Sequence, residues 1–95
     1  MLTIILLLCI ALLAVDWLQT RVISKNPERF TEANPILGKH PSLRAVNIYF
    51  ACCVVATVAL AWLLPYWFAI AAGVALAALE AFVTLRNHRL GIGMG

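Results

Sequence analysis

The hydrophobic pattern divides the chain into long apolar stretches around one polar segment. The first stretch, Met1 to Leu18, contains a single charged residue, Asp16. The second, Ala45 to Leu85, also contains a single charge, Glu80. It is twice as long as the ~20 residues that cross a ~30 Å hydrocarbon core, so it must form a hairpin of two helices. The pattern predicts an all-α integral membrane three-helix bundle in one domain, with spans at about 1–20, 44–64 and 65–86.

The polar segment 21–43 predicts an ordered loop rather than a loose tether. Asn26 before Pro27 and Glu28 is typical of a helix N-cap, so a short helix "PERFTEA" is expected to lie at the membrane interface. Ser42 is placed to cap the second span. The residues after the third span, 87–95, predict a short tail.

Charge placement predicts the orientation in the membrane. The composition is 64% hydrophobic and 12% charged, whereas about a quarter of residues are charged in soluble domains. The net charge is +3, and positive residues mark the cytoplasmic side of membrane proteins. The N-terminus is therefore expected outside and the C-terminus inside, and the basic residues are assigned to topology rather than to nucleic-acid binding. The basic residues lie in two places, between the first and second spans or after the third: Arg21, Lys25, Arg29, Lys39 and Arg44, then Arg86 and Arg89.

Polar residues within the spans are expected to meet near the cytoplasmic side. Asp16 precedes Arg21 by five residues and Glu80 precedes Arg86 by six, which places both acids at a similar depth. Intramembrane ionisable residues are costly and mark functional sites by default. The predicted cluster contains Asp16, Gln19, Thr20, Asn47, Glu80 and Thr84, and Glu32, Asn34 and His40 of the loop are expected to cover it.

Three interpretations of this cluster remain open. It can be a hydrogen-bonded structural element that holds three helices in register, or a pore or proton-linked site. It can also be a metal or hydrolytic centre built from Asp16, Glu32, His40 and Glu80, although no His-x-x-x-His or Glu-x-x-His pair is present. No catalytic residue, metal ligand or cofactor is assigned from the sequence.

Small residues recur every four positions along the third span. Such a ridge lets another helix backbone approach closely in a membrane. The ridge is expected either to pack against the second span or to contact a neighbouring subunit. Its members are Ala69, Gly73, Ala77 and Ala81, and the matching set on the second span is Cys53, Thr57 and Ala61.

Several segments resemble a group of small three-span membrane proteins encoded by bacteriophages and prophages. These segments are "DWLQT", "NPERFTEANPILGKHPS", "LEA" and "RNHRLGIG". The layout is also similar to that of class I holins, which cross the inner membrane three times and assemble into large lesions. The resemblance implies a multi-pass protein of the bacterial inner membrane.

Three functions follow as expectations. The first is holin-like permeabilisation by a homo-oligomer within the lipid bilayer. The second is a non-pore interaction protein, for superinfection exclusion or assembly, that contacts a membrane partner through the cytoplasmic loop. The third is a small membrane enzyme or metal protein that uses the buried carboxylates.

Overall fold

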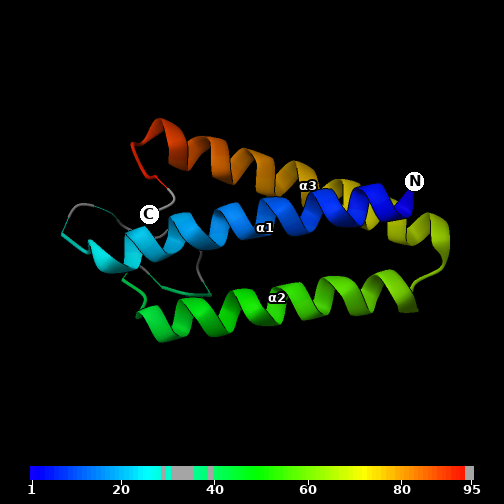
Figure 1. Cartoon of the computed structure of the whole chain (residues 1–95), viewed down its shortest axis with the longest axis horizontal. Coiled ribbons are helices and arrows are strands. Elements are labelled where there is room, and N and C mark those ends of the chain that lie inside the picture. The colour runs from blue at the N-terminus through cyan, green and yellow to red at the C-terminus, as the bar shows by residue number, and fades with distance from the viewer. Residues whose placement is uncertain (29, 31–35, 39, 94–95) are drawn as a thin grey trace.

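Three long helices make up the fold. The computed structural model describes residues 1–28, 30, 36–38 and 40–93, and these contain no strand. Helix α1 spans Leu2–Lys25, α2 spans Leu43–Leu63 and α3 spans Tyr66–Arg89 (Figure 1). Each is long and apolar enough to cross a membrane. The longest extent of the molecule, 44 Å, matches the ~40–45 Å thickness of a bilayer with its headgroups. The fold is that of a multi-pass, all-helical membrane protein.

Helix α1 is the centre of the bundle, because α2 and α3 each pack along it and barely touch one another (Figure 1). The prediction that the second and third spans pack mainly against each other is therefore wrong. The small-residue surface of α3 is covered by α1 instead: a Cβ atom on Gly73 would lie 2.5 Å from Cγ2 of Ile5. A close approach of this kind is available only where the helix carries no side chain.

The two ends of the bundle differ in character. The N-terminus of α1 and the α2–α3 turn lie at one end, and the loop and the C-terminal residues lie at the other, which we call the loop end (Figure 1). The exposed basic residues Lys25, Arg44, Arg86 and Arg89 all belong to helix segments at the loop end. The inside or outside location of the loop end stays a prediction from these charges.

The first helix is longer than the sequence pattern predicts, ending at Lys25 instead of about residue 20. Asn26 explains the end point. Its backbone N–H donates to the Ile23 carbonyl at 3.2 Å, and its side-chain Nδ2 donates to the Val22 carbonyl at 2.8 Å. Asn26 thus closes α1, whereas the sequence pattern assigned it to the start of a second, interfacial helix.

The described part of the loop is fixed to the bundle at a few points. Pro27 and Glu28 form a turn, and the rest of the predicted interfacial helix lies outside the described residues, so that helix stays a prediction. Gly38 has a φ of +81°, a left-handed conformation that favours glycine. Leu37 packs against the core, and Ser42 Oγ accepts from the Ala45 N–H at 3.1 Å, which confirms the predicted cap of α2.

Candidate functional site

A buried polar cluster lies between α1 and α3 near the loop end. Each of its six side chains is at most 9% exposed. Burying so many polar groups is costly unless they bond to one another. We refer to the following residues as the polar cluster: Asp16, Gln19 and Thr20 on α1, and Glu80, Thr84 and Asn87 on α3.

Two carboxyl groups meet in this cluster, as the sequence analysis predicted. Asp16 and Glu80 approach within hydrogen-bonding range across the α1–α3 interface. Thr20 Oγ1 donates to Asp16 Oδ1 at 3.2 Å, which satisfies one acceptor of that side chain. Glu80 Oε2 is buried and receives no hydrogen bond from a described residue. The charged neighbour of Glu80 is thus another acid, with no compensating base among the described residues.

Amide groups fasten the same interface closer to the loop end. Gln19 Nε2 donates to the Thr84 carbonyl at 3.1 Å, and Asn87 Nδ2 donates to Gln19 Oε1 at 3.2 Å. Asn87 was expected in the tail, because the hydrophobic pattern predicts that the third span ends at about residue 86, and its role in this interface was not predicted. A helical signal was present: Asn87 follows Thr84 by three residues and Glu80 by seven, which places all three on one face.

Asn47 does not join the polar cluster, contrary to the prediction. Its Oδ1 accepts from Trp17 Nε1 at 2.9 Å, so it belongs to the α1–α2 interface. Trp17 also stacks on Phe50, with ring centroids 6.0 Å apart. Phe50, Val46 and Leu13 form the buried apolar core beside them. The three helices do turn polar groups inward, but α2 directs its own to a separate partner.

The predicted loop cover is only partly described. Glu32 and Asn34 lie outside the described residues. His40 is exposed, which does not fit a place beneath the buried acids. The loop residue that does reach the bundle is Leu37, and it contacts the apolar core rather than the polar cluster.

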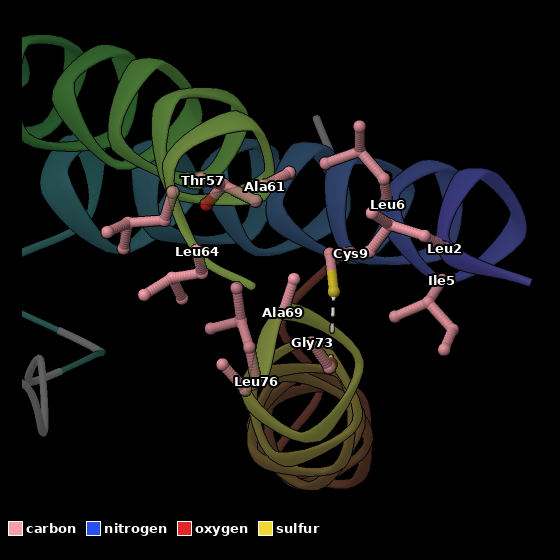
Figure 2. Close-up of a pocket in the computed structure, with 12 residues that line it drawn as sticks. Leu2, Ile5, Leu6, Cys9, Thr57, Ala61, Leu64, Ala69, Gly73 and Leu76 are labelled. Atoms are coloured by element: carbon pink, nitrogen blue, oxygen red, sulfur yellow. Dashed lines mark hydrogen bonds between the residues drawn. The ribbon is translucent and has the colours of Figure 1, made fainter. Parts of the chain in front are cut away.

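Most of the small-residue ridge on α3 is buried by packing within the molecule. Ala69 and Ala77 are buried, whereas Ala81 is exposed. The Gly73 carbonyl accepts from the Cys9 thiol, with Sγ 3.2 Å from the oxygen. Figure 2 shows this bond beside an apolar cleft that residues of all three helices line. The volume of the cleft is about 260 Å³. Of the matching set on α2, Thr57 and Ala61 line this cleft, and Thr57 Oγ1 donates to the Cys53 carbonyl of its own helix at 2.7 Å.

The amide pair offers a direct test of the α1–α3 contact. We expect Gln19→Leu to lower the free energy of unfolding by about 1 kcal/mol, because it removes one interhelical bond from Thr84 and leaves Asn87 without its acceptor. In the Gln19→Leu variant, Asn87→Leu should lower the free energy of unfolding much less than it does in the wild type, because the two side chains act as a pair. Detergent unfolding followed by circular dichroism measures both. Strictly additive losses would contradict the pairing.

The metal or hydrolytic hypothesis requires four residues, and the described structure brings two of them together. Among the side chains in residues 1–28, 30, 36–38 and 40–93, no three of His, Cys, Asp and Glu gather as a metal-binding group. Of the four residues in the metal or hydrolytic hypothesis, Asp16 and Glu80 meet, His40 is exposed and Glu32 is outside the described residues.

Comparison with known proteins found no relative. No protein-family model, curated protein or solved structure matches the chain.

Proposed function

We propose that this protein is a non-pore membrane protein that acts by associating with other transmembrane helices in the bacterial inner membrane. The observation that carries the proposal is the distribution of polarity. The polar cluster is buried inside the bundle, while the outward surfaces of the helices are apolar, with large exposed residues such as Leu7, Val55, Leu79 and Phe82.

A water-filled pore needs a polar surface that faces the channel. The amide side chains of the polar cluster are bonded within the bundle, and exposing them would break the bonds between Gln19, Asn87 and Thr84. The exposed charges lie at the loop end, where they reach the interface instead of the bilayer interior. This arrangement favours interaction over the holin-like permeabilisation that the layout predicts.

Outward-facing small residues supply the surface for association. On α3, Ala71, Ala75 and Ala78 are exposed at spacings of four and three residues, so they share one helix face. Small residues on a lipid-facing surface allow close packing of another helix, which is the main attraction between helices in a membrane. The same pattern occurs on α2 at Cys52, Ala56 and Ala59. A second copy of the chain, or a partner membrane protein, fits these faces.

Bulk on the α3 face should weaken association. We expect Ala75→Leu to reduce the association constant between two differently labelled copies about tenfold, which corresponds to about 1.4 kcal/mol. Energy transfer between the labels in lipid vesicles measures it. The matched control is Ala11→Leu, because Ala11 is also exposed but lies on α1. If both variants associate like the wild type and co-purify the same membrane partner, the α3 face is not the contact.

Permeability decides between interaction and pore formation. When the protein is induced in bacteria together with a cytoplasmic endolysin, we expect the membrane potential to persist and the endolysin to stay inside. A potential-sensitive dye and the cell density report both. An abrupt loss of potential followed by lysis would overturn the proposal in favour of a holin-like function.

A further inference from the structure

We propose that Asp16 and Glu80 form a binding site for one small monovalent cation, a proton or Na⁺, within the membrane-spanning part of the bundle. This role is separate from association through the outward faces of α2 and α3. It rests on the geometry between α1 and α3.

The two buried acids lack a positively charged partner. Glu80 is 9% exposed and Asp16 is 7% exposed, and buried charges are stable only when they are paired. Glu80 Oε2 receives no hydrogen bond from the part of the chain that the structure describes. Two oxygen acceptors that face each other repel unless a proton or metal ion lies between them. The Asp16–Glu80 geometry is therefore complete only with a cation bound.

The titratable groups around the pair come from all three helices. On α1 the ionisable groups nearest to Asp16 are Arg21, whose buried Nε makes no hydrogen bond to a described residue, and the Cys9 thiol, which already donates to Gly73. On α2, Cys53 lies close enough to interact electrostatically with both acids and hydrogen-bonds with Tyr49, and neither side chain carries a positive charge at neutral pH. Arg21 and Arg86 lie five and six residues closer to the loop end. No base on these elements supplies the missing charge among the described residues.

The donor chemistry selects a small, singly charged ion. Carboxylate and hydroxyl oxygens are the donors that hard cations prefer. Asp16, Glu80 and the Thr20 hydroxyl provide only three such groups, whereas Ca²⁺ requires about six to eight oxygen ligands and Mg²⁺ retains several waters. A proton needs only the two carboxyl oxygens, and Na⁺ can use these oxygens together with the hydroxyl of Thr20.

The test measures how the folded state depends on pH and on Na⁺. The protein is unfolded in detergent micelles between about pH 6 and about pH 8, above the range of ordinary carboxyl groups and below that of thiols. If the folded bundle holds one proton that the unfolded chain releases, the unfolding constant should rise by about tenfold per pH unit. The direction follows from linkage: raising the pH removes the proton and leaves two facing negative charges. If Na⁺ is the ligand, replacing choline with Na⁺ at the upper pH should restore stability.

Matched variants isolate the pair from the other titrating groups. Glu80→Gln removes the titrating carboxyl group but keeps a hydrogen-bonding side chain of the same size, so its unfolding constant should lose the tenfold rise per pH unit and the response to Na⁺. Glu28→Gln, which changes an exposed acid in the loop turn, should retain the wild-type dependence. Both variants keep His40 and His88, so any contribution of these two residues is the same in both.

A second measurement keeps the proposal testable if Glu80→Gln fails to fold. Infrared spectroscopy of the wild type at neutral pH should show a protonated carboxyl band if the ligand is a proton, and a carboxylate band that shifts with Na⁺ if it is the metal ion. Asp16→Asn should remove either signal. A wild-type stability that responds to neither pH nor Na⁺, together with no such band, would overturn the proposal.

Discussion

Gly73→Leu is expected to lower the free energy of unfolding by about 2 kcal/mol and to separate α1 from α3 near the N-terminus. A Cβ atom at this position would lie 2.5 Å from Ile5 Cγ2, which is closer than two carbon atoms can approach, and a leucine extends further. Overpacking of this kind costs about 1–3 kcal/mol or more. Replacing glycine inside a helix contributes up to ~1 kcal/mol in the opposite direction. The steric cost dominates because Ile5 is β-branched, so its Cγ2 cannot turn away without leaving the side-chain rotamer that a helix prefers.

Thermal unfolding in detergent, followed by circular dichroism, measures this loss. Ala71→Leu is the matched control, since Ala71 is exposed on the same helix and should change the stability of the monomer by less than ~0.5 kcal/mol. Ile5→Ala combined with Gly73→Leu should recover part of the loss, because it removes the atoms that collide. Equal stability of Gly73→Leu and the wild type would mean that α1 does not lie against Gly73.

The number of spans and the meeting of the two acids followed from the sequence for a physical reason. The cost of burying charge in lipid limits where Asp16 and Glu80 can lie, and their distances from Arg21 and Arg86 set their depth. Both constraints can be read from the sequence alone. Equal depth was enough to predict that the two acids meet, because α1 and α3 run in the same direction relative to the loop end (Figure 1).

The order of packing could not be predicted in the same way. The ridge at Gly73 predicts a close helix neighbour but does not identify which one, because every helix in this chain offers apolar side chains. The choice of α1 over α2 depends on how Ile5 and Cys9 fit around Gly73, and spacing does not reveal such a fit. Asn47 was assigned to the polar cluster from its position along the second span. Its partner is instead Trp17, which lies on a different face of α1 from Asp16.

The central position of α1 connects the two proposals. Because α2 and α3 are held through α1 rather than by each other, α3 contacts α1 on one side and presents Ala71, Ala75 and Ala78 on the outside. A cation bound between Asp16 and Glu80 would hold α3 firmly on α1. Loss of the cation would loosen the helix that carries the association face. The two proposals remain separable, since Ala75→Leu leaves the carboxyl pair intact and Glu80→Gln leaves the outward face unchanged.

The attachment of α2 gives the second large effect, because Phe50 of this helix is buried against Trp17 of α1. Phe50 is 2% exposed, stacks on Trp17 and meets Tyr49 edge to face at 5.1 Å. Phe→Ala substitutions in water-soluble cores cost about 3–5 kcal/mol. Part of that cost is the free energy of transferring the side chain to water. In a membrane this part is lost, because lipid is as apolar as the protein interior, and only the cost of lost packing remains. We therefore expect Phe50→Ala to lower the free energy of unfolding by about 2 kcal/mol.

A local measurement distinguishes detachment of α2 from a general loss of structure. Cys53 is half-buried one turn from Phe50, while Cys52 is exposed, so thiol labelling of Cys53 in a Cys52→Ser background reports on this interface. Phe50→Ala should accelerate the labelling, because the cavity it leaves loosens α2 from Trp17 and Leu13. Phe68→Ala, at a phenylalanine that is 69% exposed on α3, should leave both labelling and stability close to the wild type. Equal effects of the two phenylalanine variants would show that α2 is held by contacts other than this aromatic group.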